Sequence, residues 1–131
     1  MPREMFVYNR TKETFLGIHV RVADTYFSRL VGLLGAGPLK PDAGLWIVPG
    51  NSIHTIGMSY PIDLVLLDRR QIVVGVREHV RPFSITRPRL RAYSLIELPA
   101  HTIFRSRTEP GDQLVIDDRS LVLKPLVNGG G

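Results

Sequence analysis

The sequence contains no cysteine among its 131 residues. Disulfides, iron–sulfur clusters, thiolate zinc sites and cysteine nucleophiles are therefore excluded, and packing and hydrogen bonds must stabilise the fold. No apolar run approaches the roughly 20 residues that a membrane-spanning helix needs. The N-terminal segment MPREMFVYNRTKETFLG also lacks the apolar core of a signal peptide. These absences predict a cytoplasmic protein without a transmembrane segment, or a secreted or envelope-associated one if a leader is missing from this sequence.

Lysine is scarce, with three residues against 14 arginines, and the net charge is +5. Arginine forms bidentate contacts with phosphate and carboxylate, so this basic balance is compatible with an anionic partner. An arginine-rich, GC-biased genome would produce the same balance. Nucleic acid is not expected as the partner, because the sequence shows no recognition helix, glycine-rich phosphate loop or aromatic ribonucleoprotein signature.

Internal repeats and low-complexity linkers are missing as well, and the length fits one domain with one core. Short alternating or apolar runs bounded by turn residues predict β-strands. These runs cover residues 4–8, 15–24, 44–49, 62–68, 71–80, 93–98, 110–116 and 120–125. We expect residues 1–125 to form one mostly β domain, an antiparallel β-sandwich or irregular barrel, as a monomer or weak oligomer. Residues 126–131 are expected to be a disordered tail.

Only one segment follows helical spacing clearly. From Thr25 to Leu34, apolar residues recur every three or four positions, with Asp24 able to cap the start and Gly35 able to end it. This pattern predicts one helix at the edge of the sheet. A second, short helix is expected within residues 99–106, because proline is accepted in a first helical turn.

The segment NSIHTIGMSYPIDLVLLD, residues 51–68, joins a polar stretch to a strand that is apolar on both faces. Asp63 shares a strand face with Val65 and Leu67, and a buried carboxylate is costly unless it is hydrogen-bonded or paired. Asp63 is therefore interpreted either as a tie to backbone amides of the preceding loop or as the acidic wall of a small cleft. If His54 reaches Asp63, the carboxylate would orient the imidazole and raise its pKa.

Two candidate sites follow from these patterns. A ligand-binding cleft edge is predicted around the 51–63 segment, with the single tryptophan as a core residue or a stacking platform for a flat ligand. Its residues are Trp46, Asn51, His54, Met58, Tyr60 and Asp63. An anion or partner patch is predicted in REHVRPFSITRPRLR, where the arginines could equally be a solvated cover over apolar neighbours. Its residues are Arg77, Arg81, Arg87, Arg89 and Arg91.

No cofactor and no metal site is predicted. The four histidines, His19, His54, His79 and His101, do not form the closely spaced pairs typical of zinc sites. A set of His54 and Met58 would suit copper, but two residues alone are not a persuasive ligand set.

Several spaced motifs, in order along the chain, resemble the domain of unknown function family 192. They are GLLG at residues 32–35, GLWIVP at 44–49, YPIDLVLLD at 60–68, AYSLIELPA at 92–100 and PGDQLVI at 110–116. The resemblance covers nearly the whole chain and implies a compact, mostly β single domain. It brings no established activity.

The chain departs from that family's pattern at one place. Many members carry an aromatic-Met-Lys-Asn-Thr sequence where this chain has His54-Thr55-Ile56-Gly57-Met58. A role built on that lysine or asparagine therefore does not transfer, and the chain is expected to belong to a histidine-containing subgroup.

The sequence thus predicts a small ligand- or partner-binding module with a cleft near His54 and Asp63. One alternative is an enzyme that uses His54 and Asp63 as an acid/base pair, although no nucleophile with a local signature accompanies them. Another alternative is an accessory protein for cell-envelope assembly that binds its partner through the basic loop at residues 77–91.

Overall fold

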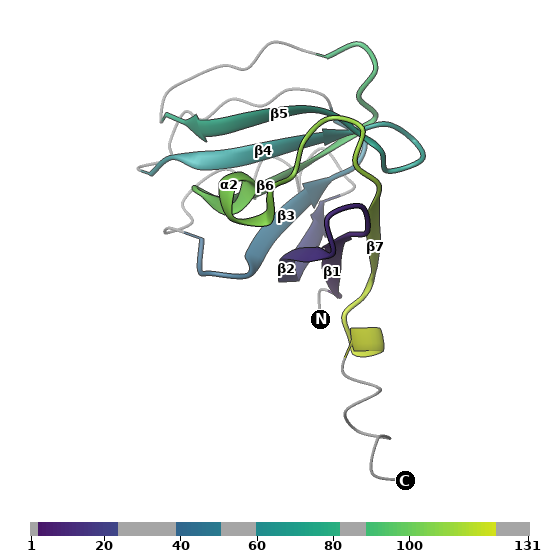
Figure 1. Ribbon diagram of the computed structural model, residues 1–131. Helices are drawn as coiled ribbons and strands as arrows, with labels where there is room; N and C mark the ends of the chain where they lie inside the picture. Colours follow the sequence, from purple (N-terminus) through teal and green to yellow (C-terminus); the bar gives the residue numbers. More distant parts are fainter. Residues whose placement is uncertain (1–2, 24–38, 51–59, 82–88, 123–131) are drawn as a thin grey trace, which may run out of the picture.

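The computed structural model describes residues 3–23, 39–50, 60–81 and 89–122. Seven strands form one sheet in the order β5-β4-β6-β3-β2-β1-β7, and the sheet curls into a half-barrel (Figure 1). The strands are β1 (Glu4–Asn9), β2 (Thr14–Ala23), β3 (Ala43–Ile47), β4 (Ile62–Leu67), β5 (Val73–Val80), β6 (Ser94–Pro99) and β7 (Leu114–Asp118). The mostly β prediction is confirmed, and the irregular barrel describes the sheet better than the sandwich.

Strand pairing is antiparallel throughout this sheet except between β2 and β3, which run parallel. The two edges of the sheet approach each other at one end of the curl. There the Val73 amide donates to Asp112 O at 2.9 Å, the Gly111 amide donates to Val73 O at 2.8 Å, and Ile72 pairs with Gln113. These bonds satisfy backbone groups at the edge strand β5 that would otherwise be open to water.

The sheet has two apolar faces, and β4 contributes to both. Val65 and Leu67 belong to the core cluster that also contains residues of β1, β7 and the short helix, whereas Ile62, Leu64 and Leu66 belong to a second cluster. We call the side of the first cluster the inner face and the side of the second the outer face. All six residues of β4 are buried, so this strand, whose sequence is apolar on both faces, is covered on both.

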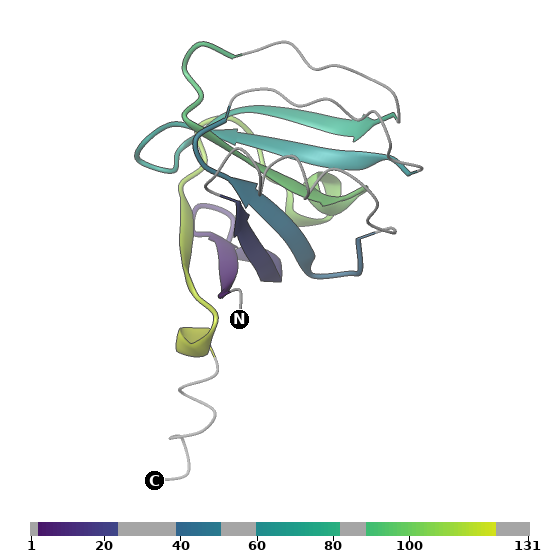
Figure 2. The same ribbon diagram turned by 180° about the vertical axis from the view of Figure 1, so that it is seen from behind.

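The inner face is covered by α2 (Thr102–Ser106), which lies in front of the sheet in Figure 1 and behind it in Figure 2. This helix contacts β2 and β4, and its Ile103 joins the inner cluster. The expected second helix is therefore present but shorter than residues 99–106. The expected helix over Thr25–Leu34 lies outside the described residues.

The strand expected at residues 120–125 is wrong over its described part, because residues 120–122 form a helical turn. The Asp118 carboxylate accepts the Ser120 amide at 2.9 Å, and the Val122 amide donates to Arg119 O at 3.1 Å. An aspartate side chain that bonds the backbone two residues ahead starts a turn, so the strand preference of the apolar run in SLVL is overridden.

Among the described residues, no helix is both long and apolar enough to cross a membrane.

Candidate functional site

Asp63 lies in the core of the inner face with none of its surface exposed. One carboxylate oxygen accepts the His79 amide at 2.9 Å, and the other accepts the Ile103 amide at 2.9 Å. The first bond holds β4 to the end of β5, where His79 has a left-handed backbone (φ 55). The second holds β4 to the start of α2. Asp63 therefore ties backbone amides, as one interpretation of the sequence held, but these amides belong to β5 and α2 and not to the preceding loop.

Trp46 also lies on the inner face, packed against its core cluster. Its indole N–H donates to Ser94 Oγ of the neighbouring strand β6 at 3.0 Å. A half-buried tryptophan whose polar atom is satisfied in this way is typical of a core position.

Tyr60 lies on the opposite side of the sheet, because it packs against the outer cluster. The three described members of the predicted cleft edge are therefore divided, with Trp46 and Asp63 inside the curl and Tyr60 outside it. Asn51, His54 and Met58 lie outside the described residues.

The outer face carries a second buried carboxyl group, that of Glu97 in β6. Glu97 is directly opposite Leu45 of β3 and Leu64 of β4, both of which belong to the outer cluster. Only 3% of Glu97 is exposed, and its Oε2 has no hydrogen-bond partner among the described residues. An unpaired polar atom at such depth is uncommon in native structures and calls for an explanation.

Burial raises the pKa of Glu97 to about 8. At neutral pH this carboxyl group is therefore mostly protonated, and it can donate as well as accept a hydrogen bond. Burial also raises the pKa of Tyr60, with a further contribution from the charge of Glu97. The phenol and the carboxyl group are thus near neighbours electrostatically, and both favour their neutral forms.

Two arginines lie on the outer face at its β5 edge. Arg77 is opposite Leu64, so its side chain leaves the sheet on the same side as Glu97, and its Nη1 donates to Val76 O at 3.3 Å. The guanidinium of Arg89 lies over Gly75, where an added Cβ would be 2.7 Å from Nη2. The Nε of Arg89 is buried with no partner among the described residues, so this face holds unsatisfied donors and acceptors together.

Glu97 could have been noticed in the sequence. In YSLIELP the residues Leu95 and Glu97 alternate with Ile96 and Leu98, and every one of these four is buried. A glutamate inside a strand that is apolar on both faces must be buried wherever it points. Asp63, however, has the same sequence signature, and only the tertiary contacts distinguish the two.

The other members of the predicted arginine patch lie apart from this face or outside the described residues. Arg91 lines a hollow beside the turn between β4 and β5. Arg81 lies just beyond the end of β5, and Arg87 lies outside the described residues.

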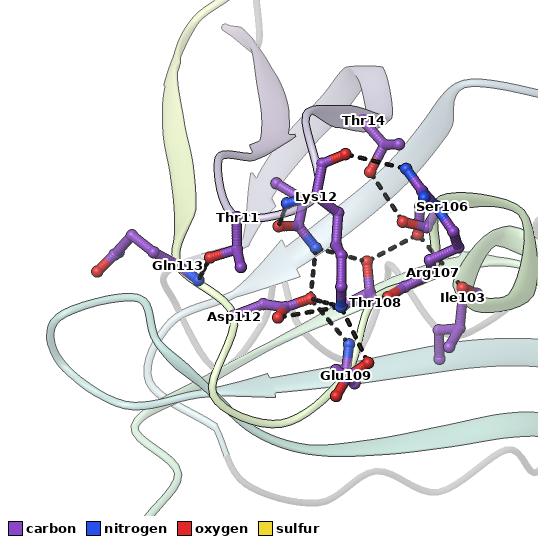
Figure 3. Close-up of polar contacts among 11 residues, drawn as sticks. Thr11, Lys12, Thr14, Ile103, Ser106, Arg107, Thr108, Glu109, Asp112 and Gln113 are labelled. Atoms are coloured by element: carbon purple, nitrogen blue, oxygen red, sulfur yellow. Dashed lines mark hydrogen bonds and ion pairs between the residues drawn. The ribbon is translucent and has the colours of Figure 1, made fainter.

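A partly buried polar network joins the β1–β2 turn to the loop before β7 (Figure 3). The Asn9 amide donates to Thr108 Oγ1 at 3.1 Å and to Asp112 Oδ2 at 2.8 Å, and Lys12 Nζ donates to Glu109 and Asp112 at 3.0 and 2.9 Å. Burial alone would raise the pKa of Asp112, but the hydrogen bonds from Asn9 and Lys12 outweigh it and lower that pKa. Each of these groups has partners, so the network is structural.

No group of three or more histidine or acidic side chains that could hold a metal ion occurs in the part of the chain that the structure describes. His79 and His101 form a ring pair with centroids 5.8 Å apart, and His19 contacts Glu4 at 3.0 Å.

Comparison with solved structures shows that the fold is shared. A Sinorhizobium meliloti protein described as a "putative transcription regulator" matches with a TM-score of 0.74 and 20% identity, over 88% of this chain and 93% of that one. A protein of unknown function from Novosphingobium aromaticivorans matches with a TM-score of 0.72 and 16% identity, over 85% of this chain and 82% of that one.

Comparison of sequences shows the family. A UPF0127 protein of Thermococcus sibiricus is 31% identical over 90% of this chain and 80% of its own length. A UPF0127 protein of Pyrococcus horikoshii is 31% identical over 82% of this chain and 96% of its own length. The sequence profile of the DUF192 family, described as "Uncharacterized ACR", matches residues 7–116. The chain therefore belongs to the DUF192 family, as its motifs indicated.

Proposed function

We propose that this protein is a small-molecule binding module whose site lies on the outer face of the sheet, around Glu97 and Tyr60. The observation that supports this proposal is the buried carboxyl group of Glu97, whose Oε2 has no partner among the described residues. Folding alone does not account for it, because an apolar residue of similar size between Leu45 and Leu64 would avoid the desolvation cost. Groups that destabilise the fold are concentrated at functional sites.

The chemistry of the two side chains limits the ligand. A protonated carboxyl group and a neutral phenol in apolar surroundings disfavour an anion, because it would approach a group that can itself ionise to a negative charge. They favour a neutral molecule whose hydroxyl or amide group exchanges hydrogen bonds with Glu97, since Arg77 and Arg89 on the same face disfavour a cation. Asn51, His54 and Met58 remain part of the proposal, because they lie in the segment 51–59 that leads into Tyr60.

A melting-temperature screen with neutral sugars and amides at pH 6.5 tests this function, since a ligand that binds only the folded state stabilises it by mass action. We expect at least one class to raise the Tm of the wild-type protein and to lose most of that effect in Glu97→Leu, which removes both the donor and the acceptor of the carboxyl group. Glu78→Leu is the matched control, because Glu78 is exposed on β5. A ligand that stabilises Glu97→Leu as well as the wild type would refute the site.

An acid/base enzyme is the second candidate, now with Glu97 in the role that the sequence suggested for Asp63. It is favoured by the pKa of about 8, because a general acid works best when its pKa lies near the operating pH. Asp63 is less suited to that role, since both of its oxygens accept backbone amides. If a ligand found in the screen is converted by the wild type and bound unchanged by Glu97→Gln, the enzyme interpretation replaces the binding module.

A further inference from the structure

A hollow of about 450 Å³ lies beside the turn between β4 and β5, at the end of the sheet where this turn projects in Figure 1. We propose that this hollow binds a small organic polyanion through its phosphate or carboxylate groups. The site is separate from Glu97, and its lining residues come from the β4–β5 turn and from the segment that leads into β6. They are Asp68, Arg69, Arg70, Ile72, Leu90, Arg91, Ala92 and Tyr93.

Positive charge dominates the lining. Arg69, Arg70 and Arg91 are exposed, and none of them forms an ion pair with a carboxylate in the described part of the chain. The one acidic residue of the lining is Asp68, and its Oδ1 already accepts the amides of Arg70 and Ile72 at 2.8 and 3.0 Å. Three guanidinium groups around one hollow, with the acid engaged by backbone, favour a ligand with more than one negative charge.

Arg69 is held in a fixed orientation before any ligand arrives. Its guanidinium carbon lies 4.1 Å from the centroid of the Tyr93 ring, which is within the range of a cation–π contact. A guanidinium held over an aromatic ring by a cation–π contact can still form bidentate N–H bonds to phosphate or carboxylate. Less side-chain entropy is then lost on binding than for an unstacked arginine.

The backbone around the hollow is fixed as well. The Tyr93 amide donates to Leu67 O at 2.7 Å, which fastens the 90–93 segment to the end of β4. Gln113 Nε2 donates to Arg70 O at 2.8 Å, which fastens the turn to the loop before β7. A preformed hollow of this volume lies within the roughly 300–1,000 Å³ typical of small-molecule sites.

The fourth feature of the hollow is Leu90, which is 97% exposed. An apolar side chain at the rim of a basic hollow suits an organic anion with an apolar portion better than an inorganic ion. Because of this exposed leucine, we expect the ligand to be organic.

Calorimetric titration of the full chain with citrate and with pyrophosphate at 150 mM sodium chloride tests the proposal. We expect saturable binding of at least one of them, and the two arms tell carboxylate from phosphate recognition. Arg69→Gln/Arg91→Gln should weaken binding by about tenfold to a hundredfold, the range for lost charge-assisted hydrogen bonds. Arg3→Gln/Arg21→Gln removes the same net charge from exposed positions on and beside β1 and β2 and should change the affinity by less than about twofold.

Arg69→Lys separates a built site from simple charge attraction. It keeps the net charge but removes the stacked fork, so we expect about a tenfold loss of affinity in a protein with unchanged Tm. If neither anion binds saturably, or if the Arg3→Gln/Arg21→Gln control loses as much affinity as the hollow variant, the proposal is wrong. Equal affinity of Arg69→Lys and wild type would also overturn it.

Discussion

Asp63 and Glu97 are buried carboxyl groups on adjacent strands of one sheet, but they lie on opposite faces of it. Asp63 is on the inner face and has a backbone amide on each oxygen. Glu97 is on the outer face, surrounded by leucines, and its Oε2 has no partner among the described residues. The two side chains are almost equally buried, with 0% of Asp63 and 3% of Glu97 exposed. Their hydrogen-bond partners, and not their depth, therefore determine how each carboxyl group affects the stability of the fold.

A buried acid stabilises or destabilises the fold according to its hydrogen bonds. Two hydrogen bonds from backbone amides offset the desolvation of Asp63 and join three elements. Glu97 has no such compensation from the described residues and is held mostly protonated at neutral pH. A buried group that destabilises the fold is the better candidate for a ligand-binding residue.

The largest effect is expected from Asp63→Ala. The substitution removes two hydrogen bonds and leaves the His79 and Ile103 amides without that partner, so we expect a loss of about 3–5 kcal/mol. Urea unfolding measures it. Asp63→Asn, which keeps one acceptor oxygen, should lose less. A loss below about 1 kcal/mol for Asp63→Ala would show that the two buried acids are energetically alike.

Glu97→Gln is expected to act in the opposite direction and to depend on pH. The carboxyl group has its ordinary pKa of 4.5 in the unfolded chain and about 8 in the folded one, so the folded state binds the proton more tightly. The wild type therefore has its full stability below about pH 4.5 and loses some of it as the pH rises to about 8. Glutamine does not titrate and avoids this loss.

The difference between Glu97→Gln and wild type should thus be small at pH 5 and reach a few kcal/mol in favour of the variant at pH 9, at most about 5 kcal/mol. Thermal or urea unfolding across this pH range measures it. The exposed Glu78→Gln control should give a flat difference. A difference that does not grow with pH would mean that Glu97 has a compensating partner.

The smallest effects come from a matched pair of glycines. Gly44 packs on the inner face, where an added Cβ would lie 2.8 Å from Glu97 O and 3.0 Å from Leu98 Cδ2. Backbone and core atoms cannot move away easily, so Gly44→Ala should cost about 1–3 kcal/mol. At Gly75 the obstacle is the end of the Arg89 side chain, which can rotate away, and Gly75→Ala should cost less than about 1 kcal/mol. Urea unfolding of both variants measures the difference, and equal costs would show that the guanidinium is as firmly packed as the inner core.

Much of the fold could be read from the alternation of apolar residues. It predicted the positions of all seven described strands within a few residues and left Arg69-Arg70 as the link between two of them. It failed at residues 120–122, because the Asp118 side chain starts a turn there. It also could not reveal that β2 and β3 pair in parallel, since pairing direction depends on how the intervening chain crosses.

The candidate site was predicted less well. The sequence singled out Asp63, Trp46 and Tyr60 as one cleft edge, and the sheet places the first two on one face and the third on the other. It placed Glu97 in a strand and left Arg69-Arg70 between two strands, as the structure does, but assigned none of them to a site. The site differs for one reason, because the sequence shows that a polar side chain is buried but not which groups meet it from other strands.

A mostly β, cysteine-free, arginine-rich chain of the DUF192 family can be recognised from its sequence, since composition and period-two patterning are properties of short segments. Which buried acid is satisfied, which is not, and which arginines gather around a hollow follow from the fold. Those outcomes depend on strand order, register and curl, which bring residues as far apart as Asp63 and Ile103 within hydrogen-bonding distance.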